Sequence, residues 1–285
     1  MHRIGRGTTT SGKGVVVRQI GWVAVAVALV LFDRAFVGAA VFAVPDSVRQ
    51  MRAPHEEVHV LRAHESGTPV GEQRLRAVVE NDTLVLEVAT SFNRGEQWDE
   101  HCEMSLGSGY RAKSFRKVAR RGGKVVGEQR VDFTTGLTSW VYDGESGERT
   151  FAYAPDTYLG PMLGVILAAV TERPHGEASF ETVVFRPEPH VYTIRATALG
   201  EESFRVGDVF EPTTKVRLKA DLGPTQNVLF ARLIPTHYFW FTRNESPEFF
   251  AFEGELGYGG QELSMVPERW SAATVRNATL PLTLQ

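Results

Sequence analysis

The sequence predicts a mainly β fold, in which a single large, strongly curved antiparallel sheet wraps around one buried apolar helix. Two observations predict it. Apolar and polar residues alternate with period two through most of residues 56–267, which is typical of strands with one buried face. Residues 158–170 interrupt this rhythm with an uncharged run. A helix that is apolar on every side must be enclosed, and a curved sheet can enclose it.

Turn signals divide the alternating pattern into strands, each expected to pair with its predecessor as a meander. In the first half the turns fall at Asn81-Asp82, at 107–109, at Gly122-Gly123 and at Asp143-Gly144. No linker or shift in composition divides the chain, so we expect one β-rich domain over 56–267. The expected strands are 58–62, 75–79, 84–90, 97–106, 110–121, 125–133, 140–142, 150–153, 178–185, 190–197, 204–209, 215–219, 228–234, 237–241, 249–256 and 262–266.

The pentapeptide Val-Gly-Glu-Gln-Arg occurs twice, at 70–74 and at 126–130. Both copies follow a glycine-led turn and run into alternating residues. No third copy follows at the same spacing, so the chain is no repeat array. The two copies indicate two hairpins with the same local design.

The uncharged segment 158–170 predicts a helix of about ten to twelve residues. Pro161 can occupy the first helical turn, where its missing N–H is not needed. Pro174 marks the end. A helix of this length is too short to span a membrane.

The amino terminus predicts a secretory signal over residues 1–43. Four basic residues and no acid precede an apolar run at 20–32, and small residues follow near Ala40 and Ala43. The sequence Val-Phe-Ala at 41–43 suits cleavage, which predicts an exported, periplasmic protein. The alternative is an uncleaved anchor over 15–44 in the inner membrane, which would hold two charges in or near the bilayer at about 2.5–3.5 kcal/mol each. Residues 44–55 form a lead-in, and 268–285 a loosely ordered tail.

Charge and cysteine content exclude some functions. The leader holds five of the 31 Lys and Arg and one of the 34 Asp and Glu, so the remainder carries a net charge of −7. This argues against nucleic acid as a partner. Cys102 is the only cysteine, so no intrachain disulfide forms, and we expect a buried structural thiol.

Residues 55–59 match the His-Glu-x-x-His pattern of zinc proteases. That chemistry needs both histidines on one face of a helix. Pro54 and the alternating residues that follow predict a strand instead, where positions i and i+4 lie about 13 Å apart. We therefore expect no catalytic residue, no metal and no cofactor, and a zinc hydrolase that uses His55, Glu56 and His59 is the less favoured alternative.

Two polar stretches could bind ligands or simply face solvent. In 98–103, alternation places Asp99, His101 and Glu103 on one face and Trp98, Glu100 and Cys102 on the other. A metal site or a Cys–His pair is conceivable, but a solvated face backed by Trp98 and Cys102 is favoured. Residues 111–124 hold seven Lys and Arg and no acid. They could dock anionic headgroups or an acidic protein, or form a solvated hairpin face.

Three short stretches resemble a group of exported bacterial proteins of unknown function. The likeness spans about residues 56–266, and it implies a half-barrel meander around helical elements, similar to the periplasmic lipoprotein carriers (LolA/LolB-like). In those carriers the concave apolar face accepts acyl chains, whereas this chain offers one clear helix where they use several. The stretches that carry the resemblance are Gly-Thr-Pro-Val-Gly-Glu at 67–72, 202–210 with 215–216, and Phe-Trp-Phe-Thr-Arg at 239–243 with 247–249 and 252–253.

We therefore expect an exported, non-enzymatic protein that binds a lipid, an acyl chain or another apolar ligand or segment in the concave face of the sheet. The same residues could instead be ordinary core. The alternative function is a structural or assembly factor of the cell envelope that holds a protein partner through the 111–124 hairpin or a strand edge. The candidate lining residues are Tyr158, Leu159, Met162, Leu163, Ile166, Leu167, Phe239, Phe241 and Phe252.

Overall fold

The computed structural model describes residues 42–51, 53–142, 144–173, 175–186, 188–206, 209–223, 235–244, 247–255 and 261–268. Most of the predicted leader lies outside these residues, as do the strand expected at 228–234 and all of the tail except residue 268.

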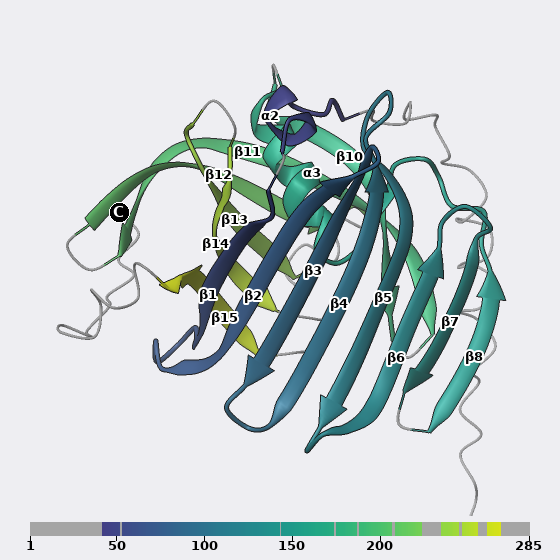
Figure 1. The fold of residues 1–285 in the computed structure, drawn as a ribbon. Helices are drawn as coiled ribbons and strands as arrows, with labels where there is room; N and C mark the ends of the chain where they lie inside the picture. Colours follow the sequence, from purple (N-terminus) through teal and green to yellow (C-terminus); the bar gives the residue numbers. More distant parts are fainter. Residues whose placement is uncertain are drawn as a thin grey trace, which may run out of the picture. The chain divides into compact units, whose positions relative to one another are not determined.

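In this described part, fifteen strands form one large open sheet, which confirms the predicted fold class (Figure 1). The order is β8-β7-β6-β5-β4-β3-β2-β1-β15-β14-β13-β12-β11-β10-β9, and every pair is antiparallel except β9 with β10. Two meanders therefore meet where β1 pairs with β15. The strands are β1 (His55–Ala63), β2 (Pro69–Glu80), β3 (Thr83–Phe92), β4 (Glu96–Ser105), β5 (Arg111–Arg121), β6 (Lys124–Asp132), β7 (Leu137–Tyr142), β8 (Glu145–Thr150), β9 (Thr157–Tyr158), β10 (Glu177–Phe185), β11 (Pro189–Val206), β12 (Val209–Ala220), β13 (Thr236–Thr242), β14 (Phe249–Glu255) and β15 (Glu262–Pro267).

The predicted helix is α3 (Met162–Thr171), which begins directly after Pro161. It lies in the concavity between the two meanders, as Figure 1 shows. A second helix in the described residues, α2 (Asp46–Arg49), is a single turn. Neither has the length and apolar character needed to cross a bilayer.

Two turns and one bulge explain how the strands connect. Gly122 and Gly123 both have positive φ, as do Asn81 and Asp82, so both pairs form the tight hairpin turns that their sequences indicate. The strands expected separately at 190–197 and 204–209 are one long strand, β11. A register shift between Ala198 and Gly200 lets the ladder continue through the irregularity.

The ends of the first meander differ from expectation. The strand expected at 150–153 is shifted to β8, because the turn at Gly144 is tight and pairing with β7 starts directly at Glu145. Tyr158, expected in the helix, belongs instead to the two-residue strand β9. Pro161 is the N-cap residue of α3, just before the first helical position, where its missing N–H costs no hydrogen bond.

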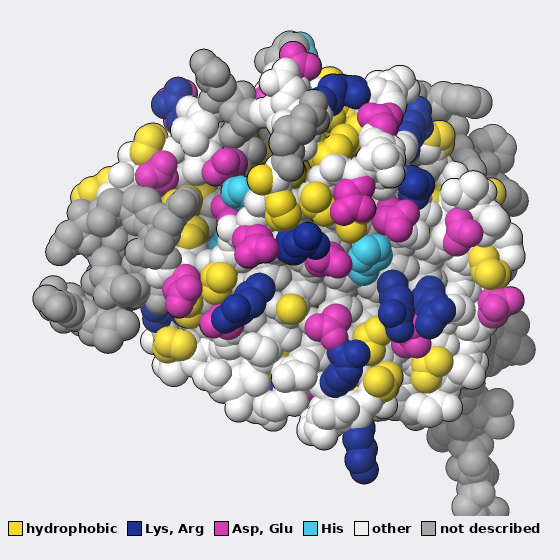
Figure 2. Space-filling view, in the orientation of Figure 1, with side chains coloured by type: hydrophobic (Ala, Val, Ile, Leu, Met, Phe, Trp, Pro, Cys, Tyr) yellow, Lys and Arg dark blue, Asp and Glu magenta, His cyan; other side chains and the backbone are white. Residues whose placement is uncertain are grey.

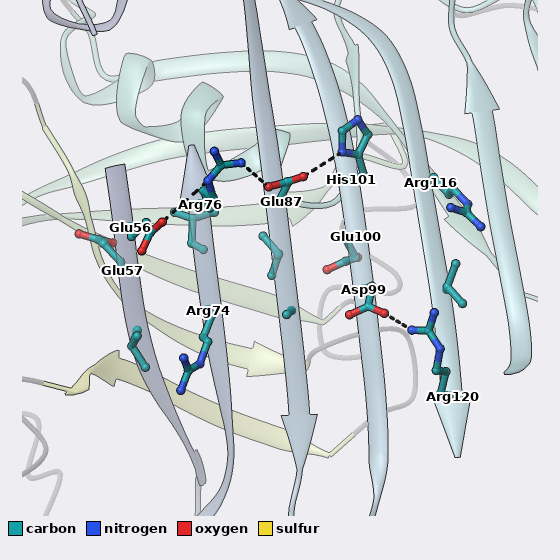
Figure 3. Close-up of a pocket in the computed structure, with 15 residues that line it drawn as sticks. Glu56, Glu57, Arg74, Arg76, Glu87, Asp99, Glu100, His101, Arg116 and Arg120 are labelled. Atoms are coloured by element: carbon teal, nitrogen blue, oxygen red, sulfur yellow. Dashed lines mark hydrogen bonds and ion pairs between the residues drawn. The ribbon is translucent and has the colours of Figure 1, made fainter. Parts of the chain in front are cut away.

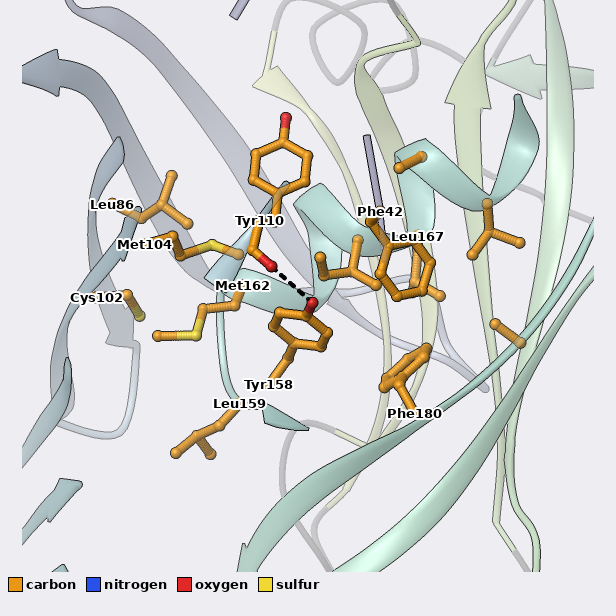
Figure 4. Close-up of a cluster of buried hydrophobic side chains, with 14 of the residues drawn as sticks. Phe42, Leu86, Cys102, Met104, Tyr110, Tyr158, Leu159, Met162, Leu167 and Phe180 are labelled. Atoms are coloured by element: carbon orange, nitrogen blue, oxygen red, sulfur yellow. Dashed lines mark hydrogen bonds between the residues drawn. The ribbon is translucent and has the colours of Figure 1, made fainter. Parts of the chain in front are cut away.

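The main core joins α3 to strands of both meanders (Figure 4). Phe42, which lies within the predicted leader, belongs to this core and is only 2% exposed. Its ring packs edge-on against Tyr158 at 5.9 Å and against Phe180 at 6.0 Å between centroids. Its carbonyl accepts a hydrogen bond from the Tyr110 backbone N–H at 3.1 Å. Phe42 therefore closes one end of the enclosed interior.

We expect Phe42→Ala to lower the free energy of unfolding by about 3–5 kcal/mol, because it leaves a cavity between two packed rings. Denaturant titration of both proteins measures the difference. Phe210→Ala is the matched control, since that side chain is 60% exposed, and it should cost at most about 1 kcal/mol. Equal losses in the two variants would contradict the core assignment.

The concave face as candidate binding site

The part of the concave face that contacts α3 is filled. Tyr158, Met162, Ile166 and Leu167 are at most 1% exposed. The Tyr158 hydroxyl donates a hydrogen bond to the Tyr110 carbonyl at 2.9 Å, and burial raises the pKa of this phenol. The other candidate lining residues in this layer are Leu159, Leu163 and Phe241, which pack into the same cluster. These seven side chains are therefore core, held against the sheet by one another.

A second cluster lies on the concave face beside this core, and here the sheet alone provides the apolar side chains. We call Val70, Phe92, Trp98, Phe239, Phe249 and Phe252 the aromatic patch. Phe239 joins the two clusters, because it packs against both. Its ring lies 5.0 Å from that of Phe252, and Phe92 lies 4.9 Å from Trp98, in both cases between centroids. The patch therefore combines strands of both meanders.

The aromatic patch is less enclosed than the core around α3. Val70, Trp98, Phe239 and Phe249 are only partly buried, whereas the α3-facing residues Met162, Ile166 and Leu167 are fully buried. Of the predicted lining residues, Phe239 and Phe252 lie here. Sequence reasoning did not select Trp98 or Phe249 for the site, although alternation had already placed Trp98 on the inward face.

A half-buried ion pair borders the aromatic patch. Lys117 of β5 lies over the Trp98 ring, with its Nζ 3.9 Å from the centroid. The same Nζ is 3.3 Å from the Glu100 carboxylate, and the two side chains are 22% and 12% exposed. A cation held against an indole face in a partly desolvated position interacts more strongly than an exposed one. The patch thus has one polar border, formed by Lys117 and Glu100.

The His-Glu-x-x-His residues are on a strand, β1, as the sequence predicts. Glu56 is exposed and lies on the opposite face of β1 from His55 and His59. The two histidines lie on either side of Glu57, which shares their face. His59 is 1% exposed, with its ring 5.1 Å from Phe249. Within the described ranges, no three His, Cys, Asp or Glu side chains are close enough to hold a metal ion. The motif therefore lacks the geometry in which Glu activates a metal-bound water.

The polar stretch 98–103 has the alternation expected of it. Cys102 is fully buried in the main core, and burial raises the pKa of its thiol well above the ordinary value. The side chains of Asp99 and His101 are 53% and 44% exposed. A thiol with a raised pKa is a poor nucleophile, so Cys102 has a packing role.

The basic stretch 111–124 is matched by acids on the neighbouring strands. β5 lies between β4 and β6, and both supply carboxylates to its cations. Figure 2 shows the outer face, where positive and negative side chains are interspersed. The five pairs, of which Lys117–Glu100 lies on the concave face, are Lys113–Glu103, Arg116–Glu128, Lys117–Glu100, Arg120–Asp99 and Arg121–Glu96. This pairing favours a solvated hairpin face over an anion-docking surface.

The outer face carries a shallow hollow of about 490 Å³ across β1–β5 (Figure 3). Its upper border is a charge ladder in which Arg76 lies 2.7 Å from Glu87 and 3.8 Å from Glu56. Asp99 and Arg120 form the lower border. Sequence reasoning missed this hollow, because its lining residues come from five different strands. Only the pairing register of these strands brings the residues side by side. Exposed pairs of this kind contribute about 0–1 kcal/mol each.

Comparison with known proteins bears on the fold. No family model matches the chain, and neither does any curated protein. One similar solved structure is the crystal structure of a beta-barrel-like protein of domain of unknown function DUF1849 from Brucella abortus. The two share 11% sequence identity with a TM-score of 0.46, over 75% of this chain and 95% of that chain. This likeness concerns the fold alone.

His237 borders the aromatic patch and should make stability depend on pH. Its ring stacks on Phe252, 6.0 Å between centroids, and burial lowers its pKa below 6.5, although Glu255 and Glu262 oppose the shift. The unfolded chain therefore takes up this proton first, so stability is present above about pH 6.5 and declines as the pH falls below it.

We expect His237→Phe, which retains a ring on Phe252, to reduce the loss of stability as the pH falls below about 6.5. Denaturant unfolding of parent and variant at a series of pH values measures both slopes. Identical slopes for the two proteins would contradict the role of His237.

Proposed function

We propose that this protein is an exported, non-enzymatic binding protein whose aromatic patch receives an acyl chain or another apolar ligand. The observation that supports the proposal is the contrast within the concave face. The sheet-facing side chains of α3, Met162, Ile166 and Leu167, are fully buried, whereas Trp98, Phe239 and Phe249 beside them are only partly buried. Aromatic side chains of this size bury large areas against an apolar ligand. The resemblance to the periplasmic lipoprotein carriers supports the same class of ligand.

In this proposal the residues first expected to line the site divide into two groups. The residues of α3 and β9 form the floor and keep the two meanders apart, so they support the site without touching the ligand. Phe239 and Phe252 line the site from the second meander, and Trp98 lines it from the first. Lys117 and Glu100 provide the polar border at the Trp98 end.

The ligand proposal is tested by direct binding. We expect apolar compounds to co-purify with the protein and to appear in the mass spectrum of an organic extract. We also expect a dansyl-labelled fatty acid to bind, with affinity reduced about tenfold or more in Trp98→Ala and in Phe239→Leu, because each removes aromatic contact area.

Leu199→Ala is the control for binding, since Leu199 is 47% exposed and lies outside the patch. Thermal unfolding of each variant separates lost contacts from lost fold. A protein from which no apolar compound is extracted, and which binds no probe, would exclude the proposed ligand class.

Export with removal of the leader upstream of Phe42 belongs to the same proposal. Cleavage after Ala43 would remove a ring that packs against Tyr158 and Phe180. Cleavage after Ala40 fits the small residues at 38–40 and retains Phe42.

We expect the intact mass of the periplasmic protein to correspond to a chain that starts at Val41. Phe42→Ala should leave that mass unchanged apart from the substitution. A mature chain that starts at Val44, or a protein that stays in the membrane fraction at full length, would each contradict this processing.

A further inference from the structure

The strand β8 ends the sheet order, and within the described residues it pairs on one side only, with β7. The Phe151 N–H donates to the Gly136 carbonyl at 3.0 Å, just beyond the β7–β8 ladder. Because hydrogen-bonded pairs alternate along an antiparallel ladder, the N–H and C=O groups of Ser146, Glu148 and Thr150 point away from β7. All three residues are exposed. β8 therefore presents a row of backbone groups that can accept another strand.

We propose that β8 pairs antiparallel with β8 of a second copy of this chain, in the register centred on Gly147. The sequence of the strand is Glu-Ser-Gly-Glu-Arg-Thr. In this register Glu145 lies opposite the second copy's Arg149, and the two-fold symmetry repeats the pair. Ser146 lies opposite Glu148, and both have outward-pointing backbone groups that exchange N–H···O=C bonds. The neighbouring register, centred on Glu148, would place that carboxylate against its own copy.

The local geometry suits this register. Glu145, Gly147 and Arg149 share one face of β8, opposite Tyr142, Trp140 and Thr138 of β7. A Cβ on Gly147 would collide with the Trp140 ring, so no side chain stands at the centre of the contact. In this register Glu145 and the second copy's Arg149 form a pair whose backbones exchange no hydrogen bonds. Pairs of this kind have Cα atoms about 4.5 Å apart, which brings their side chains closest together. Both charged side chains are exposed in the single chain.

Self-complementary charge is what selects a second copy as the occupant. β8 supplies its own charge complement through a two-fold axis, because Glu145 and Arg149 exchange places between the two copies. The exposed apolar residues nearest the edge belong to β7, namely Leu137, Val141 and Tyr142 at 41%, 43% and 53% exposed. The second copy's strand would lie next to β8, one strand away from these residues.

Sedimentation equilibrium of the protein purified as the cell produces it tests the proposal. We expect a monomer–dimer equilibrium, with Arg149→Glu raising the dimer Kd roughly tenfold because two attractive pairs become repulsive. The double reversal Glu145→Arg with Arg149→Glu should restore the parent Kd. A protein that stays monomeric up to about 0.5 mM overturns the proposal. A dimer insensitive to Arg149→Glu overturns the assignment to β8.

Cysteine cross-linking tests the register. In the double variant Glu145→Cys with Arg149→Cys, mild oxidation by copper phenanthroline should give a disulfide-linked dimer. Each single variant should stay uncross-linked, since its two cysteines would be about 13 Å apart in this register. Native Cys102 is fully buried and does not compete. Equal cross-linking of a single variant, or capture of a different protein in its place, would show another register or another occupant.

Discussion

The uncharged helix α3 cannot face water over most of its surface, and the architecture follows from that requirement. Met162, Ile166, Leu167 and Val170 are fully buried, while Leu163 and Val165 stay partly exposed. Side chains from both meanders cover α3, and the two meanders curve toward each other around it. The seam between β1 and β15 holds the two meanders in one sheet. The enclosed core includes Phe42 and Tyr158 at one end. The aromatic patch exists because the sheet continues past the region that α3 fills.

Charge on the outer face is organised by register rather than by segment. β5 is strongly basic as a linear sequence, but it lies between strands whose carboxylates match its outward-facing cations, Arg116 with Glu128 and Arg120 with Asp99. A solvated pair contributes little to stability, yet a one-residue slip would place every charge on the wrong face. The pattern therefore favours one register. Within the described residues, β8 carries the same kind of alternation but has no strand on its outer side.

Local signals predicted the elements that local chemistry determines. Pro161 marked the entry to α3, and the Gly122-Gly123 and Asn81-Asp82 pairs marked tight turns with positive φ. The 190–206 region was divided in two, because a bulge at Gly200 looks in sequence like the end of a strand. The patch was predicted only in part, since Phe92 and Phe252 meet across about 160 residues. Phe42 packs in the core although it falls within the predicted leader, since a small apolar run has the same composition in a cleavage site and in a core.

The pairing of β1 with β15 also bears on how the chain folds. His59 lies opposite Pro267, about 200 residues away in sequence. Closing so long a loop is slow, because its entropy cost is met before any contact is made. The first meander, with the apolar residues of β3, β4 and β5 on its inner face, is complete long before β13 to β15 are synthesised. Until they dock, Leu86, Met104 and Phe115 have only α3 and their neighbours to cover them. Long-range pairing of this kind leaves apolar strand faces exposed for longer during folding, which favours aggregation over productive docking.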